Sequence, residues 1–590
     1  MSLRIVRVER LCGPRLWKSR WTCRGFSTTR PTRIDDIAVG TPVRPEAKPY
    51  YVTTPIFYVN AAPHVGHLHS LLLTDVLARY ARLRDPNREV RFATGTDEHG
   101  LKIQQVAKGL GREPGDLCDE ISERFRALAK AANASNTNFI RTTDPAHKLA
   151  VQHLWKELEK NGHIYKGSHS GWYAVSDECF YTEAQIGDVV DPVSGEIKKV
   201  ALESGSTVEW TEEENYKFRL SSFKQSLIDW LEASPDSVHP PSTQTHLLKT
   251  LQSEPLQDLS ISRPASRLSW GVPVPNDPEH TIYVWVDALT NYLTVLGYPW
   301  KGEEGGETLG VEGRHGWPVD AHVVGKDIVR FHAIYWPAML IAAGLSPPKQ
   351  VIAHAHWTMN KSKMSKSKGN VADPFEAMER YGVDAVRWYL MRVGGSLSGD
   401  ADYSAGEMEK HYKLLASQVG NLASRIASPK LQKRFLKAAS THPDATSLVH
   451  PEVQELRKVF LRCRDVLEER LDTLEISRGL EEAMEMVFEA NRLFTALEPW
   501  KSDTSDTDVI NAMVFAHESL RLLGIALTPI MPSKTAELLG SLHVSPDKRT
   551  WENLVWDEEA ALRRVVESVN SAMQVKGKKQ VLFPALVEDA

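Results

Sequence analysis

Two histidines flank a glycine early in the chain, in the sequence His64-Val65-Gly66-His67. These residues lie where an expected strand gives way to an expected helix. In a parallel sheet this position is a ligand crevice, and the helix N-terminus there presents unpaired N–H groups. Gly66 lets a nucleotide approach the backbone closely, and the two imidazoles can donate hydrogen bonds to phosphate oxygens. We therefore expect a nucleotide site contacted by His64, Gly66 and His67, with both histidines catalytic. The alternative is a pair of histidines that only cap the helix.

A lysine-rich loop occurs later, in the sequence Lys363-Met364-Ser365-Lys366-Ser367. Lysine ammonium groups on a loop of Gly and Ser are suited to a mobile clamp that neutralises a triphosphate and releases pyrophosphate. We expect all five residues to contact the nucleotide, with Lys363 and Lys366 catalytic. A solvated basic loop is the alternative, which is disfavoured because both motifs follow strands.

Together the two motifs resemble the signatures of class I aminoacyl-tRNA synthetases. Further segments narrow the resemblance to the methionyl-tRNA synthetase family: TTPIFYVN at 53–60, TGTDEHG at 94–100, YVWVDA at 283–288, and GKDI at 325–328 followed by Phe331-His332. The resemblance covers nearly everything from residue 50 onward. It implies an enzyme that activates L-methionine with ATP to methionyl-adenylate, releases pyrophosphate, and transfers the amino acid to tRNA(Met).

The resemblance also implies the substrate contacts. Asp97 receives the ammonium of methionine, Gly325 contacts ATP, and the pocket for the side chain is walled by Ile56, Tyr58, Trp285, Ala288, Leu289, Tyr292, Ile328 and His332. Aromatic walls suit a thioether, which is apolar and polarizable. Two alternatives stay open: Asp97-Glu98-His99 as metal ligands, although adjacent residues seldom chelate one ion, and Trp285 with Tyr292 as simple core.

The expected cofactor is ATP as its Mg²⁺ complex. Many relatives carry zinc-binding cysteine pairs in an inserted segment, whereas here only Cys179 lies in that segment. We therefore expect no zinc and no other bound metal.

Three residues in the last third of the chain are candidates for contact with RNA. Asn421 and Arg425 are four residues apart, so on a helix they share a face. Trp500 follows Pro499, and a proline that ends a helix can leave the indole exposed. An exposed aromatic ring beside amide and guanidinium groups suits unstacked loop bases. These positions match the anticodon-reading residues of the family. The alternative is that Trp500 packs between helices and Arg425 is a surface charge.

The expected elements place these residues. A strand over 50–58, a helix over 68–83 and a strand over 89–94 form a βαβ unit that opens a parallel sheet. Strands are expected again at 280–286, 322–324 and 350–354, with a helix over 328–343. Beyond about residue 376, long amphipathic patterns predict a helical bundle. The expected fold is α/β: a class I synthetase Rossmann-like parallel-sheet catalytic domain with an inserted connective domain, followed by an α-helical anticodon-binding bundle.

Domain boundaries follow from these patterns. They are 1–34 for a mitochondrial transit peptide, 35–48 for a linker, 49–160 and 256–352 for the two halves of the catalytic domain, 161–255 for the connective insertion, 353–410 for the lysine loop and a stem-contact region, and 411–590 for the anticodon-binding domain.

The first 34 residues carry eight Arg and one Lys against the single acid Glu9, which is typical of a mitochondrial transit peptide. A signal peptide needs an unbroken apolar core, which arginines interrupt here, and a basic RNA-binding arm is a second alternative. This segment carries +8 and the whole chain −5, so about −13 belongs to the rest. A surface that binds phosphate everywhere is therefore excluded, and tRNA must be held by local basic patches and shape. We expect the mitochondrial matrix as the location.

A chain of 590 residues with 42% hydrophobic and 25% charged residues is expected to form two to four domains of a soluble enzyme. We find no run of about 20 apolar residues for a membrane helix, and we expect a monomer.

Three alternative functions are disfavoured. Synthetases for leucine, isoleucine and valine are longer than this chain because they carry an editing insertion. A small nucleotidyltransferase has a single domain. An RNA-binding scaffold without catalysis does not need the two motifs.

Overall fold

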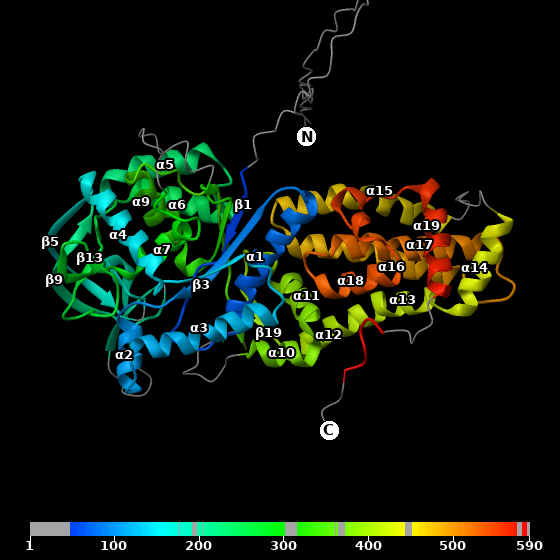
Figure 1. Cartoon of the computed structure of the whole chain (residues 1–590), viewed down its shortest axis with the longest axis horizontal. Coiled ribbons are helices and arrows are strands. Elements are labelled where there is room, and N and C mark those ends of the chain that lie inside the picture. Colours follow the sequence, from blue (N-terminus) through cyan, green and yellow to red (C-terminus); the bar gives the residue numbers. More distant parts are fainter. Residues whose placement is uncertain are drawn as a thin grey trace, which may run out of the picture. The chain divides into compact units, whose positions relative to one another are not determined.

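The computed structural model describes residues 48–175, 177–190, 197–202, 204–300, 315–359, 362–363, 372–442, 451–574 and 581–586 (Figure 1), with backbone only for 362–363 and 451–452. The segment expected as a transit peptide lies outside these residues, as does the linker up to residue 47. Met364, Ser365, Lys366 and Ser367 also lie outside them, and of Lys363 only the backbone is described.

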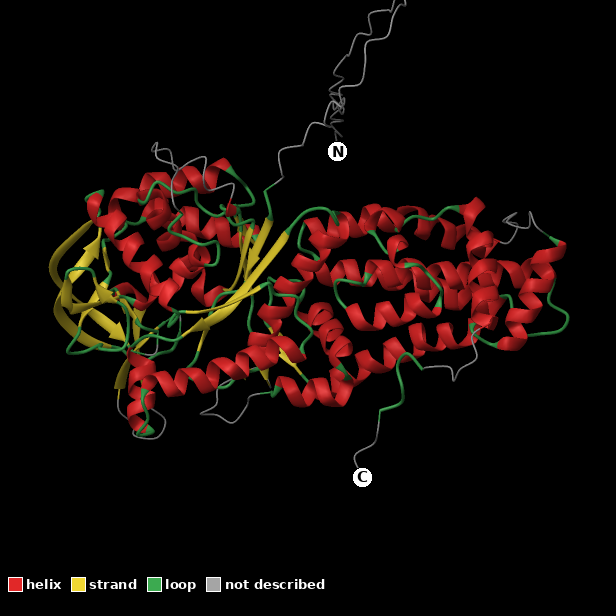
Figure 2. Ribbon diagram, in the orientation of Figure 1, coloured by secondary structure: helices red, strands yellow, loops and turns green. Residues whose placement is uncertain are grey.

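A seven-stranded sheet forms the centre of the catalytic half, with strands in the order β10-β16-β15-β1-β3-β2 and β4 beside β3. All its pairings are parallel. Its strands are β1 (Tyr50–Thr53), β2 (Phe57–Tyr58), β3 (Val90–Asp97), β4 (Asn138–Arg141), β10 (Val238–His239), β15 (Ala321–Gly325) and β16 (Val351–His354). Most of their residues are buried, as in parallel sheets covered on both faces by helices (Figure 2). The predicted parallel sheet is confirmed.

An antiparallel sheet interrupts this pattern, with strands in the order β11-β9-β5-β6, namely β11 (Leu259–Ser260), β9 (Glu209–Phe218), β5 (Ile164–Ala174) and β6 (Cys179–Tyr181). Nearby, β7 (Ile186–Val190) and β8 (Ile197–Ala201) form a two-stranded ribbon. The helices α5 (Lys224–Ala233) and α6 (Pro241–Ser253) follow. Strand β10, which lies between these two helices in the sequence, pairs with β16 of the central sheet.

Two predicted elements differ from the structure. The strand expected over 280–286 ends at Ile282, where β14 (Asp277–Ile282) gives way to α7 (Val284–Thr294). Helix α7 packs on α4 (Pro145–Lys160) and is buried on nearly every side, so its apolar run has no helical period to reveal it. The helix expected over 328–343 contains a π-helical turn at Phe331–Tyr335 before α9 (Trp336–Ala342), because Pro337 has no N–H to donate.

The other elements of the catalytic half are α1 (Val65–Arg84), α2 (Leu101–Gly109), α3 (Pro114–Ala131), β12 (Ser262–Pro264), β13 (Pro273–Val274), β17 (Trp357–Met359), β18 (Ser362–Lys363) and β19 (Ala401–Tyr403). The helical part comprises α10 (Pro374–Tyr381), α11 (Val383–Gly394), α12 (Ala405–Leu415), α13 (Asn421–Ile426), α14 (Pro429–Thr441), α15 (Pro451–Asp472), α16 (Ile476–Ala496), α17 (Asp506–Ala526), α18 (Pro532–Ser541) and α19 (Glu558–Gln574). The predicted helical C-terminal part is confirmed.

Helix α17 is the centre of the bundle and packs against α14, α16, α18 and α19. By length and composition it could cross a membrane, contrary to our expectation that no segment would pass this test. Its apolar window is entirely buried within the bundle, and the core helix of a soluble protein passes the same test. The difference arises because a helix surrounded by other helices is apolar on all faces.

Helix α1 is joined to the helical part by a fully buried arginine, Arg387 of α11. Its guanidinium donates to Asp75 of α1 at 2.6 Å and to the backbone oxygens of Pro529 and Ile530 at 3.0 and 2.7 Å. Its remaining nitrogen donates to the oxygen of Ala132, after α3. One side chain thus ties together α1, the end of α3, α11 and the α17–α18 connection.

We predict that Arg387→Met lowers the free energy of unfolding by roughly 3–5 kcal/mol, because the substitution leaves Asp75 short of a partner and removes the donor to buried carbonyls. Thermal and denaturant unfolding measure this change. Lys410→Met, which removes an exposed ion pair with Glu407, is the control and is expected to change stability by less than about 0.5 kcal/mol. Equal unfolding midpoints for both variants would contradict the role of Arg387.

Candidate functional site

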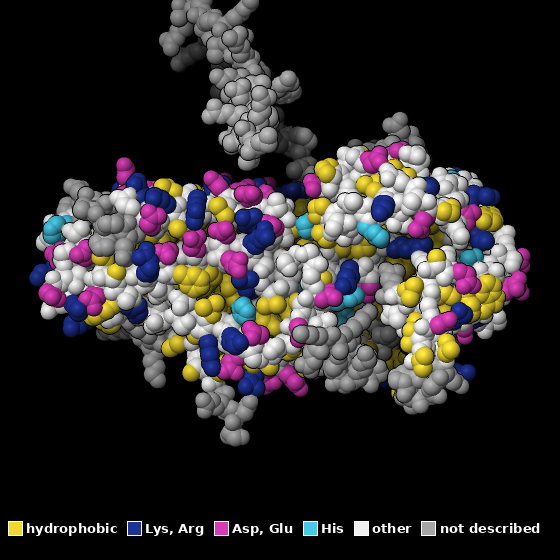
Figure 3. Space-filling view, turned by 180° about the vertical axis from the view of Figure 1, so that it is seen from behind, with side chains coloured by type: hydrophobic (Ala, Val, Ile, Leu, Met, Phe, Trp, Pro, Cys, Tyr) yellow, Lys and Arg dark blue, Asp and Glu magenta, His cyan; other side chains and the backbone are white. Residues whose placement is uncertain are grey.

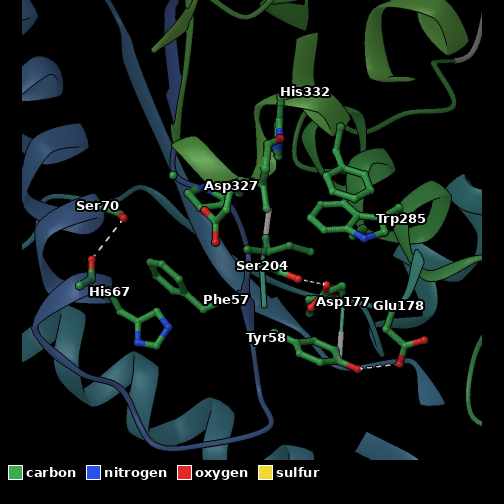
Figure 4. A pocket seen from close by; sticks show the side chains of 18 of the residues that line it. Phe57, Tyr58, His67, Ser70, Asp177, Glu178, Ser204, Trp285, Asp327 and His332 are labelled. Atoms are coloured by element: carbon green, nitrogen blue, oxygen red, sulfur yellow. Dashed lines mark hydrogen bonds between the residues drawn. The ribbon is translucent and has the colours of Figure 1, made fainter. Parts of the chain in front are cut away.

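A cavity of about 440 Å³ opens at the carboxyl ends of β1, β3, β15 and β16 (Figure 4). In parallel sheets ligands bind at this edge. All the predicted nucleotide and methionine residues whose side chains are described line the cavity: Ile56, Tyr58, His64, Gly66, His67, Asp97, Trp285, Ala288, Leu289, Tyr292, Gly325, Ile328 and His332. The structure thus brings these residues together, while their individual roles stay predictions.

The two histidines cap helix α1 as well as line the cavity. His64 is the N-cap residue, and its Nδ1 accepts from the Gly66 N–H at 3.0 Å. The His64 N–H in turn donates to His67 Nδ1 at 3.1 Å, and the two rings stack 3.8 Å apart. Since each Nδ1 accepts a hydrogen bond, each neutral ring carries its proton on Nε2. The two histidines therefore cap the helix, as in the alternative interpretation, and they also line the cavity. Each can donate a hydrogen bond through its Nε2–H group.

Asp97 ends strand β3 with a buried carboxyl group, and among the residues that the structure describes its Oδ1 has no hydrogen-bond partner. Burial raises the pKa of Asp97 well above its usual range, and the nearby carboxylates of Asp287, Glu178 and Glu98 raise it further. A cationic ligand would reverse both effects, because it supplies the missing donor and the missing opposite charge.

The neighbours of Asp97 are engaged elsewhere. Glu98 accepts two hydrogen bonds from Arg141, at 2.7 and 2.9 Å. His99 Nδ1 donates to Asp287 at 2.7 Å, and His147 donates to the other oxygen of Asp287 at 2.9 Å. Burial opposes the charge on Asp287, but the two histidines outweigh it and lower its pKa to about 2. Asp97, Glu98 and His99 therefore do not converge on one point.

Among the residues that the structure describes, no three His, Cys, Asp or Glu side chains are placed to hold a metal ion. The expectation that the chain binds no zinc stays a prediction.

The apolar side of the cavity is aromatic. The Trp285 ring stacks on Phe331 with centroids 3.7 Å apart. His332 Nδ1 donates to the Ile328 oxygen at 2.9 Å, so its Nε2 accepts from the Tyr292 hydroxyl at 2.7 Å. Burial lowers the pKa of His332 to about 4, which keeps the ring neutral. The Tyr292 hydroxyl and the His332 imidazole are hydrogen-bonded to each other, so the wall that they form is compatible with a weakly polar ligand. Tyr292 belongs to the core and lines the cavity at the same time.

Several residues that line the cavity were not identified from the sequence. One group comes from the antiparallel sheet and its loops, and the other comes from the catalytic half. Asp177, Glu178, Tyr181, Ser204 and Ser206 come from the antiparallel sheet and its loops. The acidic pair beside Cys179 was the available signal, but nothing in its spacing indicated a site. The others that were missed are Pro55, Phe57, Ser70, Val284, Asp327, Phe331, His354, Ala355, His356 and Trp357. Phe57, Val284, Asp327 and Phe331 lie in or beside the segments that carried the family resemblance.

In the helical part, Arg425 and Trp500 lie together. The Arg425 guanidinium lies 4.5 Å from the Phe494 ring and 5.0 Å from the Trp500 ring. Trp500 is 46% exposed, so it is not a core residue. Asn421 is exposed at the first position of α13, one helical turn before Arg425. The three predicted residues therefore include an exposed indole held beside a guanidinium group.

Comparisons with known proteins bear on this site. The family described as "tRNA synthetases class I (M)" matches residues 50–427. A probable mitochondrial methionine--tRNA ligase of Neurospora crassa is 41% identical over 592 residues, covering 97% of this chain and 92% of that protein. The mitochondrial methionine--tRNA ligase of Homo sapiens is 43% identical over 518 residues, 85% of each chain. The crystal structure of Mycobacterium tuberculosis methionyl-tRNA synthetase bound by methionyl-adenylate superposes with a TM-score of 0.76 at 36% identity, covering 86% of this chain and 96% of that one.

We predict that the protein loses stability as the pH falls from about 6.5 to 4, partly through His332. In that interval the unfolded chain binds a proton at this residue and the folded chain does not, so the contribution is roughly 3 kcal/mol at the lower end. His332→Gln should therefore flatten the dependence of the unfolding midpoint on pH, whereas the exposed His246→Gln should leave it unchanged. Parallel curves for all three proteins would be evidence against a neutral buried His332.

Proposed function

The chain belongs to the class I tRNA synthetases for methionine, and on this premise we propose that it attaches L-methionine to tRNA(Met) for translation in the mitochondrial matrix. The observation that carries the proposal is one cavity whose lining combines the buried carboxylate of Asp97, aromatic side chains and the two histidines that cap α1. The matrix location is supported by the basic segment 1–34 and by relatives named mitochondrial. We also propose that the chain acts as a monomer without a membrane anchor, which sedimentation of the purified protein tests.

Methionine binding uses opposite ends of the cavity. The ammonium group pairs with Asp97, which has an acceptor oxygen available. The thioether contacts the aromatic and aliphatic wall, to which Ile56, Tyr58, Trp285, Ala288, Leu289, Tyr292, Ile328 and His332 contribute. A thioether sulfur is a weak acceptor with a preference for ring edges, so a wall whose hydroxyl and imidazole bond each other suits it better than a hydroxyl-bearing side chain.

Activation needs no nucleophile from the protein. A methionine carboxylate oxygen attacks the α-phosphorus of ATP, which enters as its Mg²⁺ complex, and the bond from that phosphorus to the pyrophosphate oxygen breaks. The Nε2–H groups of His64 and His67 and the N-terminus of α1 stabilise the charge on the phosphates. Gly325 lets the nucleotide approach the backbone after β15. Lys363 and Lys366, with Met364, Ser365 and Ser367, contact the triphosphate and neutralise pyrophosphate.

Transfer completes the reaction. A ribose hydroxyl at the 3′ end of tRNA attacks the carbonyl carbon of the mixed anhydride, the ester bond forms, and AMP leaves. Positioning of the two substrates accounts for much of the acceleration in such reactions.

Recognition of tRNA relies on local contacts rather than overall charge. Basic and acidic side chains are interspersed over the face in Figure 3. We propose that Asn421, Arg425 and Trp500 read the anticodon, because an exposed indole already aligned with a guanidinium offers a stacking surface to an unpaired base.

Exchange of labelled pyrophosphate into ATP in the presence of each of the twenty amino acids tests the proposed reaction. We expect exchange with methionine alone and without tRNA. Exchange that needs no amino acid, or that prefers another one, would refute the assignment.

We predict that Asp97→Asn raises the dissociation constant of methionine at least a hundredfold, about 3 kcal/mol, because a buried ammonium group loses its counter-charge. Isothermal titration calorimetry on the folded variant measures this. The exposed Asp116→Asn is the matched control and should bind like the unaltered protein. Normal affinity in Asp97→Asn would show that the ammonium lies elsewhere.

We predict that Trp500→Ala lowers the efficiency of aminoacylation of tRNA bearing the CAU anticodon by a factor that corresponds to roughly 1–3 kcal/mol of stacking, with pyrophosphate exchange unchanged. Phe488→Ala, another exposed aromatic residue of the helical part, should affect neither reaction. If Trp500→Ala slows both reactions equally or lowers the melting temperature markedly, Trp500 serves the fold and not the anticodon.

A further inference from the structure

Glu178 is a buried carboxylate in the lining of the cavity, contributed by the loop between β5 and β6. Its Oε1 accepts from the Tyr58 hydroxyl at 3.2 Å and from the Lys102 N–H at 2.7 Å, and its Oε2 accepts from the Tyr173 hydroxyl at 2.8 Å (Figure 4 shows the Tyr58 contact). These donors come from β2, α2 and β5. One side chain therefore joins the antiparallel sheet to two segments of the catalytic half.

The backbone around this contact is fitted to it. Glu178 itself has φ +52°, in the left-handed region that non-glycine residues rarely adopt. Gly100 has φ +118°, and a Cβ at that position would lie 2.7 Å from the Tyr58 hydroxyl and 2.9 Å from Glu178 Oε1. Such local strain persists where the surrounding contacts determine the conformation, and it is common at functional sites.

The preceding residue anchors the same loop from the other side. The Asp177 carboxylate accepts from the hydroxyl groups of Tyr181 at 2.7 Å and of Ser206 at 2.6 Å, and from that of Ser204. Tyr181 belongs to β6, whereas the two serines follow β8. The loop is thereby fixed to β6 and to the segment between β8 and β9, and this limits where Glu178 can point.

Glu178 also acts on the cavity through its charge. It is one of the carboxylates that raise the pKa of Asp97, so the two groups lie within electrostatic reach of each other. A negative charge there favours a cationic group beside Asp97.

We infer that Glu178 is a positioning residue for methionine: it fixes the phenol of Tyr58 as part of the pocket wall and adds to the field that favours the ammonium group beside Asp97. This inference rests on the proposed function, which makes methionine the substrate. Of the three donors, Tyr58 lines the cavity and is assigned to methionine rather than to ATP, so loss of Glu178 should affect methionine and leave ATP binding unchanged.

The test is Glu178→Gln in methionine-dependent pyrophosphate exchange. The amide keeps the size of the side chain but removes the charge, which weakens the hydrogen bond from the Tyr58 hydroxyl, and its nitrogen cannot accept, so the three donors can no longer all be satisfied. We expect the KM for methionine to rise about tenfold, as for loss of a hydrogen bond to a charged group, with the KM for ATP and the melting temperature close to those of the unaltered chain. Glu212→Gln, an exposed glutamate on β9 of the same sheet, is the matched control with unchanged kinetics.

A second variant tests the route through Tyr58. Tyr58→Phe should reproduce most of the rise in the KM for methionine, and the double variant should be no worse than Glu178→Gln alone, because both remove one interaction. Additive effects, a wild-type KM in either single variant, or an equal rise in the KM for ATP would overturn the inference. Absence of methionine-dependent exchange in the unaltered chain would instead refute the proposed function, and this inference with it.

Discussion

The constraint on which the site depends is the buried carboxylate of Asp97, one oxygen of which has no hydrogen-bond partner within the described part of the chain. An ionised carboxylate costs several kcal/mol to bury unless hydrogen bonds and an opposite charge offset the loss of water. Asp97 receives only part of that compensation from the protein, and its pKa is raised accordingly. The carboxylate is held in place at the end of β3, and this strand is paired with β1 on one side and with β4 on the other. A bound ammonium group, as proposed for methionine, would supply the opposite charge.

The groups around Asp97 leave the charge of its carboxylate only partly compensated. Arg141 is bound to Glu98, and His99 and His147 are bound to Asp287, so these three side chains are not available to neutralise Asp97. Their charges still reach the cavity and favour a cation there. The same helix α1 that presents His64 and His67 is anchored at its middle through Arg387. The position of the end of α1 that carries these histidines therefore depends on contacts with the helical part of the chain.

The sequence predicted what local pattern and parallel topology determine. Asp97 and Gly325 were identified through the family resemblance; they end β3 and β15, the two strands that flank β1, and parallel strands bring such ends to one edge of the sheet. Helix α7 was assigned in part to a strand because its residues are buried all round and show no period. Glu178 could not be found, since loop packing and not spacing brings it to Tyr58. The lysine loop lies largely outside the described residues, so its role rests on the motif.

Calorimetric titration with two analogues tests the central claim, that the Asp97 carboxylate selects an ammonium group. Methioninol keeps the side chain and the ammonium group but lacks the carboxylate, whereas 4-(methylthio)butanoate keeps the side chain and the carboxylate but lacks the ammonium group. We expect measurable binding of methioninol and an affinity at least about a hundredfold lower for 4-(methylthio)butanoate. Equal affinity for the two, or tighter binding of the analogue without the ammonium group, would contradict it.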